Sequence, residues 1–439
     1  MLFASFVFLT IFFYLVMNRD IMSPTVIMGL SYILAIIAAI YNINNWKINL
    51  GIKTCVILLT SYVVFAVVEI AIKYLWVHGR NAENTIFPEL KEIVIPKYMI
   101  CIYLVFVSVI TFLYYIEIFR IATMYGFSGT GNFLTYYRNA ASYGVLTLEE
   151  DVNQIINQLF KLVTIGAYIF LYILLNNLIA VQLPFREKWR KYFWLRVPIY
   201  FFLVASLLTA NRLQYIRFAV AGFVMTYLLW NCHWNWTRHI SGKIVVWGIV
   251  TLVVLLISFV LLRSVVGRIS NQTPVDYITR YAGAAIELFD QYVKKPIASS
   301  DYFGEETFYG LYTVLRKLGL SSYDKIGHLE FRRLGNYGYA SNTYTAIRRY
   351  YRDFGMLGIV VFVSITSLFY SIFYYYQLRK PNKRTQYKEI LYAFMFYAIP
   401  MYSINELFFS SYISVAFIVY CVELWLLWFV VTKIRFVRR

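Results

Sequence analysis

The most informative stretch of the chain is Ser341–Gly358, which reads SNTYTAIRRYYRDFGMLG. Three arginines, one carboxylate and four aromatic residues stand here at the start of an apolar run that is long enough to cross a membrane. Such a charged segment is poorly suited to face lipid. It is suited to hold an anionic group at a membrane surface, because guanidinium groups match phosphate oxygens in charge and geometry.

The composition of the whole chain indicates a membrane protein. Of its 439 residues 60% are hydrophobic and only 14% are charged, and the mean hydropathy is +0.61. A soluble globular protein of this size would carry far more charge. We therefore predict an all-α polytopic membrane protein.

Apolar runs of about 20 residues, enough to cross roughly 30 Å of hydrocarbon, recur along nearly the entire sequence. We predict about eleven membrane helices, near residues 2–17, 21–40, 54–76, 98–119, 155–181, 192–210, 215–231, 243–262, 355–377, 388–409 and 411–432. The first run has no basic region before it and no small-residue cleavage site after it, so we expect a retained helix.

Basic residues in short loops predict the orientation. They gather in three segments, 186–191, 379–388 and 433–439, which the positive-inside rule assigns to the cytoplasm. The C-terminus is then cytoplasmic, and two other segments, 120–153 and 263–354, lie outside. The loops near 18–20 and 77–97 carry mixed charge and leave the N-terminal topology open.

This orientation divides the chain into a bundle, 1–262, a large external loop, 263–354, and a C-terminal group of helices, 355–439. The large loop holds thirteen lysines and arginines against nine carboxylates, although external loops need not be basic. Apolar periodicity predicts helices over Asp276–Lys294 and Thr307–Leu318. An anionic partner on this side is one interpretation, and a helical loop that only covers the bundle is the other.

The charged segment predicts a helix that begins near Ser341 or Asn342, either of which can act as its N-cap. If that helix is unbroken, Tyr344, Arg348 and Arg352 lie one above another on one face. The two arginines repel each other unless an anion lies between them.

Two further patterns follow from the same unbroken helix. Arg349 and Asp353 are four residues apart and can form an ion pair that only fixes the helix end. Gly355 and Gly358 would allow a close approach of another helix.

Several of these residues resemble a known family. The resemblance rests on Phe308–Gly319, His328-Leu329-Glu330-Phe331, Asn342-Thr343-Tyr344-Thr345, Tyr350-Tyr351-Arg352-Asp353-Phe354-Gly355 and Gly358. They are similar to the signature of the Wzy-type polymerases, membrane enzymes that join oligosaccharide repeat units into O-antigen or capsular polysaccharide. The match covers about 50 residues, 305–358. The family usually has closer to twelve helices.

The resemblance implies glycosyl transfer at the periplasmic face of the bacterial inner membrane. A growing glycan on polyprenyl pyrophosphate would be the donor and a single lipid-linked repeat unit the acceptor, so that the product enters lipopolysaccharide or capsule. A chain-length regulator and a flippase of the same pathway are possible partners, and nucleic acid is not expected. The chain has no Asp-x-Asp sequence and no cysteines at metal spacing, so we expect neither a metal nor a cofactor.

Without a metal, arginines would have to stabilise the departing pyrophosphate. Arg348 and Arg352 are the leading candidates for this role, and Tyr344 and Arg349 are further candidates for substrate binding beside them. Arg212 is next, because it interrupts two apolar runs where an unused charge is costly, although it could simply snorkel to the head groups.

Three other arginines are weaker candidates for substrate binding. Arg268 and Arg280 could join a pyrophosphate clamp, although Arg268 could equally anchor the chain at the interface. Arg138 stands beside two tyrosines that could stack on sugars or belong to an interfacial aromatic belt.

A base must also accept the proton of the attacking sugar hydroxyl. We predict Asp353, His328 or Glu330 for this role, with Glu305 and Glu306 as weaker options. A lone loop histidine such as His328 is more often only solvated.

Two other functions remain open. An O-antigen ligase shares the donor and the architecture, and differs in its acceptor. A lipid-linked oligosaccharide flippase or another transporter would use charges within the spans, of which Glu69 and Lys73 are four residues apart. Similar charges lie at Glu117, Lys161, Glu406 and Glu423.

Overall fold

The computed structural model describes residues 1–78, 89–142, 151–237, 242–265, 273–297, 302–320, 329–335, 340–379 and 385–433. Contacts divide the chain into two compact units. The first unit comprises residues 1–85, 272–380 and 395–418, and the second comprises 86–271, 381–394 and 419–439. This grouping differs from the linear division at 262 and 354, because the external segment and α14 pack with the N-terminal helices.

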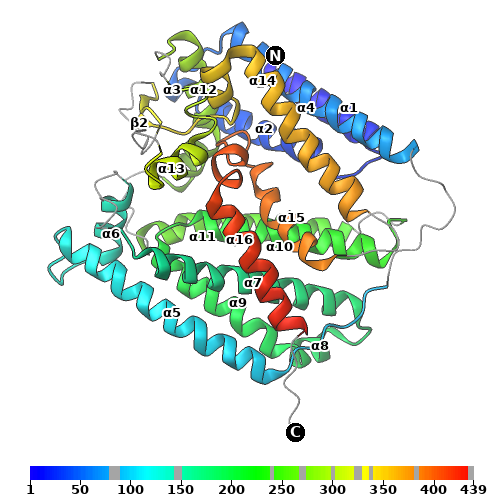
Figure 1. The fold of residues 1–439 in the computed structure, drawn as a ribbon. Coiled ribbons are helices and arrows are strands. Elements are labelled where there is room, and N and C mark those ends of the chain that lie inside the picture. The colour runs from blue at the N-terminus through cyan, green and yellow to red at the C-terminus, as the bar shows by residue number, and fades with distance from the viewer. Residues whose placement is uncertain are drawn as a thin grey trace. The chain divides into compact units, whose positions relative to one another are not determined.

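The first unit contains most of the charged motif. Its elements are α1 (Leu2–Val16), α2 (Pro24–Tyr41), α3 (Ile43–Trp46), α4 (Ile52–His78), α12 (Pro274–Lys294), α13 (Tyr309–Lys317), β1 (Arg332–Arg333), β2 (Ala340–Ser341), α14 (Ile347–Ile372), η2 (Phe373–Leu378), η3 (Phe396–Ala398) and η4 (Phe408–Tyr412). The helix α4 packs along α14, and α2 packs against α1 and α12 (Figure 1). We call the end at which α4 and α14 begin the arginine end.

All regular elements among the described residues of the second unit are helices. It contains α5 (Lys97–Met124), α6 (Phe133–Ser142), α7 (Gln154–Ala180), α8 (Phe185–Lys191), α9 (Phe193–Ala205), η1 (Ser206–Thr209), α10 (Leu213–His233), α11 (Gly242–Val265), most of α15 (Gln386–Met395) and most of α16 (Val415–Lys433). The helix α7 packs against α5, α9 and α10.

The fold is that of an all-α polytopic membrane protein, as the composition predicts. Among the described residues seven helices are long and apolar enough to cross a membrane: α2, α4, α5, α7, α10, α14 with η2, and α16. The pair formed by α8 and by α9 with η1, bent by 71°, could be an eighth. The apolar helix α1 has only 15 residues.

One predicted span is not a continuous helix. Over 388–409 the helix α15 ends at Met395, and the 3₁₀ turn η3 and several turns follow before η4. The carboxylate of Glu406 accepts hydrogen bonds from the backbone N–H groups of Phe409 and Ser410, both at 2.8 Å. An apolar run does not reveal such a break, because hydropathy does not report backbone conformation.

The helices predicted in the external segment are both present. The helix α12 begins after Thr273, whose side chain accepts from the N–H of Asp276, and Pro274 is its first residue. A Cβ atom built at Gly283 would lie only 2.6 Å from the backbone nitrogen of Ala39, so a glycine is needed where α12 crosses α2.

The charged helix begins later than predicted, and it is interrupted by a break that the sequence did not predict. It starts at Ile347, not at Ser341 or Asn342, because the preceding residues form β2 and an extended lead-in. Gly355 then interrupts it with φ 63° and ψ −147°, a conformation that is essentially restricted to glycine.

The expected close helix approach at these glycines is therefore wrong. No atom lies within 4 Å of a Cβ built at Gly355. A Cβ at Gly358 would lie 2.5 Å from the Cβ of Phe354 and from the carbonyl oxygen of Tyr350, both of the same helix. The glycines allow the chain to turn sharply between the charged segment and the apolar span.

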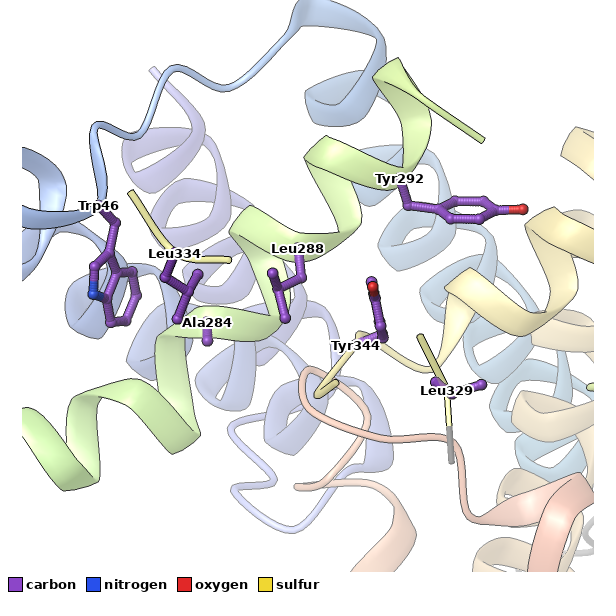
Figure 2. Packing of buried hydrophobic residues seen from close by; sticks show 7 residues of the cluster. All are labelled: Trp46, Ala284, Leu288, Tyr292, Leu329, Leu334 and Tyr344. Atoms are coloured by element: carbon purple, nitrogen blue, oxygen red, sulfur yellow. The ribbon is translucent and has the colours of Figure 1, made fainter. Parts of the chain in front are cut away.

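A small hydrophobic core holds segments from α3, α12 and the strand region together at the arginine end. Figure 2 shows its buried side chains, which come from α3, α12 and the strand region: Trp46, Ala284, Leu288, Tyr292, Leu329, Leu334 and Tyr344. Removing these apolar surfaces from water fixes the loop residues that carry the charges.

Candidate functional site

Arg348 lies at the centre of the candidate site. Its side chain is fully buried, and its guanidinium group is ion-paired with Glu306 through Nη1 and with Glu330 through Nη2. The rings of Tyr292 and Tyr344 flank it, with centroids 4.6 and 4.7 Å away. A buried cation with two carboxylates and two rings around it is a structural anchor for the segment that carries Glu306 and Glu330.

Arg352 lies one turn further along α14 and nearer to solvent. Its Nη1 is 2.8 Å from Glu305 and 3.0 Å from Glu306. The side chains of Arg352 and Glu305 are 12% and 13% exposed, whereas that of Glu306 is 5% exposed. Arg352 and Glu305 therefore form one partly accessible edge of the cluster, and Arg332 with Glu330, 15% and 19% exposed, form another.

The predicted ion pair between Arg349 and Asp353 is not formed. Arg349 donates to the carbonyl oxygen of Glu306 at 2.8 Å. Asp353 accepts from the N–H of Glu306 at 3.1 Å and from the N–H and hydroxyl of Thr307, both at 2.7 Å. Arg349 and Asp353 are four residues apart on one helix, but the loop at 305–307 supplies better-placed hydrogen-bond partners for each of them.

The charges of this site balance one another. Arg332 reaches Glu330 at 3.5 Å, which completes a set of four arginines and four carboxylates. We call this set the arginine cluster: Arg332, Arg348, Arg349, Arg352, Glu305, Glu306, Glu330 and Asp353. The anion that the sequence requires between Arg348 and Arg352 is therefore supplied within the chain by Glu306, which pairs with both.

Burial also affects the protonation of the cluster. Burial raises the pKa of Glu306 above its ordinary value, while the guanidinium groups of Arg348 and Arg352 oppose the rise. Burial likewise raises the pKa of the Tyr344 hydroxyl, which donates to the carbonyl oxygen of Glu330 at 3.1 Å. Tyr344 lies before α14 begins, and still contacts Arg348 as the sequence predicts.

An aromatic group borders the edge that Arg352 and Glu305 form. Phe303 is 74% exposed and directly precedes Gly304, which has a positive φ of 64°. The ring of Phe303 lies 5.0 Å from that of Phe354, and Phe308 lies 6.4 Å from both. An apolar surface thus adjoins the Glu305–Arg352 pair.

The other predicted residues are not part of the arginine cluster as described. Arg280 belongs to α12, where the rings of Tyr277 and Tyr281 lie within 6 Å of its guanidinium group. Arg138 in α6 and Arg212 at the start of α10 belong to the second unit, and Arg212 is buried. His328 and Arg268 lie outside the described residues.

The structure places Glu305 and Glu306, the weaker candidates from the sequence, in the arginine cluster, and it places Tyr292, which the sequence did not single out, against Arg348. A pair of adjacent glutamates after a glycine, between Phe303 and Phe308, was a usable signal, because uncompensated charge is rare in such an aromatic setting. Within the described ranges no group of three or more His, Cys, Asp or Glu side chains is arranged to hold a metal ion.

The charges within the spans have local partners. Glu69 accepts from the hydroxyls of Ser23 and Tyr375, and from the N–H and hydroxyl of Thr25, at 2.6–3.2 Å. Lys73 donates to the carbonyl oxygen of Val16 at 2.9 Å. The carboxylate of Glu69 thus caps the start of α2, a role that does not require transport.

Comparisons with family models, with curated proteins and with solved structures found no match to this chain. The function is therefore argued from the site itself.

Proposed function

We propose that this chain is a polymerase that joins polyprenyl-pyrophosphate-linked oligosaccharide repeat units at the periplasmic face of a bacterial inner membrane. One observation carries the proposal. The described parts of the stretch that resembles the polymerase signature, 305–358, meet in one cluster, and one partly accessible edge of this cluster is Arg352 with Glu305. A cation, a carboxylate and an apolar surface at one edge suit a lipid-linked pyrophosphate sugar.

The two central arginines have different roles in this proposal. Arg348 is fully buried between Glu306 and Glu330, so it positions the loop and does not touch substrate. Arg352 is at the edge and binds the pyrophosphate of the donor, exchanging part of its pairing with Glu305 for phosphate oxygens. Arg349, which is half-buried, adds positive charge behind it.

Glu305 is the best-placed group to accept the proton. Asp353 already accepts three hydrogen bonds from the loop, and Glu330 is held by two arginines, whereas Glu305 has one ion-pair partner among the described residues. The acceptor hydroxyl oxygen bonds to the anomeric carbon of the donor, its proton passes to Glu305, and the bond to pyrophosphate breaks with its electrons on the leaving group.

The apolar surface next to this edge serves the lipid part of the substrate. Phe303 and Phe354 adjoin Glu305 and Arg352 in sequence, and beyond the break at Gly355 the exposed Met356 and Leu357 continue the apolar surface on α14. A polyprenyl chain can pack along these side chains while its pyrophosphate stays at the arginines.

Glycan profiling of a deletion strain separates this proposal from its alternatives. Loss of a polymerase leaves single repeat units on the lipid A core, and loss of a ligase leaves no capped core. Loss of a flippase traps lipid-linked repeats on the cytoplasmic side. We expect single capped units, and either other pattern would contradict the proposal.

A further inference from the structure

Among the side chains that the structure describes, the exposed charges at the arginine end are all of one sign. Within the described side chains of 41–54, 273–297, 302–320, 329–335 and 340–353, the exposed charged residues are Lys47, Lys53, Lys294, Lys295, Arg316 and Arg333. The carboxylates of the same segments are all buried or half-buried: Asp276, Glu287, Asp290, Glu305, Glu306, Glu330 and Asp353. The surface is therefore more basic than the composition of these segments suggests.

Several of these cations lie on neighbouring segments. The ammonium group of Lys294 donates to the carbonyl oxygen of Asn49 at 2.5 Å, which joins the end of α12 to the loop before α4. The guanidinium group of Arg332 donates to the carbonyl oxygens of Gln291 and Lys295, both at 2.7 Å. The side-chain amide of Gln291 donates to the carbonyl oxygen of Arg333 at 3.1 Å.

We call this region the basic surface: Lys47, Lys53, Lys294, Lys295, Arg332 and Arg333. Lys294 contributes least, because it is ion-paired with the buried Asp290 at 2.5 Å.

The basic surface is held by the small hydrophobic core below it. Trp46, Leu288 and Leu334 are buried members of that core and are close in sequence to the exposed cations (Figure 2). A Cβ built at Gly335 would lie 2.5 Å from the carbonyl oxygen of Asn45, so β1 is seated directly on the α3 region. The positive charges are thus fixed on three packed segments and do not belong to one flexible tail.

The basic surface is continuous with the candidate site. Glu330 pairs with Arg332 of the surface and with Arg348 of the cluster. Lys53 lies 5.8 Å from the ring centroid of Tyr351, which neighbours Arg352 in α14. A chain molecule that lies on the surface would therefore extend directly to the Glu305–Arg352 edge.

We infer that the basic surface binds the glycan part of the substrate, and that this glycan is acidic, carrying carboxylate or phosphate groups. The inference rests on the proposed function and adds the substrate class. No carboxylate is exposed among the described residues of these segments, so the fixed cations attract a polyanion. Aromatic rings such as Tyr351 and the 49% exposed Phe331 offer faces for sugar rings. The continuity with the arginine cluster favours a glycan over an anionic membrane.

The test is direct binding to the full-length protein in nanodiscs of neutral phosphatidylcholine. The probes are an oligogalacturonate and a neutral malto-oligosaccharide of equal length, at low and high salt. The variant Lys53→Gln/Arg333→Gln removes two charges from the basic surface. Its matched control is Arg186→Gln/Arg190→Gln, which removes two exposed charges from α8 in the second unit.

We expect the wild type and the control to bind oligogalacturonate, with affinity that falls as salt rises. The basic-surface variant should bind about tenfold more weakly, because two near-surface charges together supply roughly that factor. Equal affinity of the two variants, or equal binding of the neutral oligosaccharide, would overturn the inference. So would variant-sensitive association with phosphatidylglycerol vesicles without oligogalacturonate binding.

The binding inference and the proposed function can be refuted separately. A chain that binds acidic glycan through Lys53 and Arg333 but extends no repeat units would refute polymerisation alone. A polymerase whose oligogalacturonate binding ignores both residues would refute only the inferred substrate class.

Discussion

Glu69 and Glu306 are both buried carboxylates of the first unit, but they are stabilised in different ways. Glu69 accepts four hydrogen bonds from hydroxyl and N–H donors, while Glu306 pairs with the guanidinium groups of Arg348 and Arg352. Glu69 lies roughly 24 Å along α4 from Lys53, which marks the arginine end, at about 1.5 Å of rise per residue.

The difference indicates which region serves function. The donors around Glu69 are neutral, its side chain is fully buried, and the arrangement closes the start of α2. The arginine cluster instead concentrates charge from a loop and a helix and leaves two pairs, Arg352 with Glu305 and Arg332 with Glu330, partly exposed. Burying these charges costs desolvation free energy, and buried ion pairs add little net stability, so folding alone does not require such an arrangement.

The largest expected effect is that of Arg348→Ala. It leaves Glu306 and Glu330 without their shared cation, and removing one partner of a buried pair typically costs about 3–5 kcal/mol. Thermal unfolding of the detergent-purified protein should show a strongly lowered midpoint. The control Arg333→Ala removes an exposed arginine and should leave the midpoint unchanged, and equal midpoints for the two variants would argue against an anchoring role.

Glu69→Gln should have the next largest effect on stability. The NH₂ group of the new glutamine would face hydrogen-bond donors where the carboxylate oxygen accepted from them. Lost hydrogen bonds of this kind cost about 2–3 kcal/mol. The matched change at the other end, Glu305→Gln, should cost less, because Arg352 keeps its ion pair with Glu306. Comparable losses in thermal unfolding would remove the distinction between the two regions.

Gly355→Ala tests the break between the charged segment and the span. Its φ of 63° with ψ of −147° is strained for any residue with a side chain, so we expect a loss of about 2 kcal/mol. Gly222→Ala in α10 is the control, since its new Cβ would make only an ordinary contact at 3.4 Å with Leu171. A Gly355 variant as stable as this control would contradict the described backbone.

Glu287 is another buried carboxylate. It has neither the set of hydroxyl and N–H donors that surrounds Glu69 nor the guanidinium partners of Glu306. Burial raises its pKa from 4.5 to about 6, and only Gln291 donates to it. The folded state binds the proton of Glu287 more tightly than the unfolded state does, so protonation of Glu287 stabilises the fold. This contribution is full below pH 4.5 and is lost as the pH rises through about 6. The loss reaches up to about 2 kcal/mol.

Glu287→Gln should therefore raise the unfolding midpoint at pH 7.5 and have little effect at pH 4.5. The exposed Glu187 of α8 provides the control substitution, Glu187→Gln. A lowered midpoint at pH 7.5 would show that ionised Glu287 is compensated in the folded protein.

The sequence was sufficient for features that depend on long local patterns. Apolar runs predicted helices at nearly all the observed positions, and amphipathic periodicity predicted α12 and α13. It was not sufficient where one residue decides the backbone, as at Gly355, or where turns interrupt an apolar run, as at 396–412. Periodicity carries no information on these φ and ψ angles.

The candidate site was predicted only in part for a related reason. The proximity of Arg348 and Arg352 follows from their helical spacing, whereas Tyr344 contacts Arg348 from outside the helix. The ion-pair partners of Arg348, Glu306 and Glu330, are 42 and 18 residues away. Spacing on one helix suggested Arg349 as the partner of Asp353, whereas the folded loop supplied Thr307. Tertiary contacts decided these pairs.

The most direct test of the central claim is repeat-unit extension by purified protein, reconstituted with a defined polyprenyl-pyrophosphate repeat unit, with and without a chelator. We predict chain extension by the wild type in both conditions, none by Arg352→Ala at normal membrane levels and stability, and partial activity of Arg352→Lys, which keeps the charge but loses the bidentate geometry. Full-length glycan from Arg352→Ala, or a requirement for divalent metal, would contradict the account.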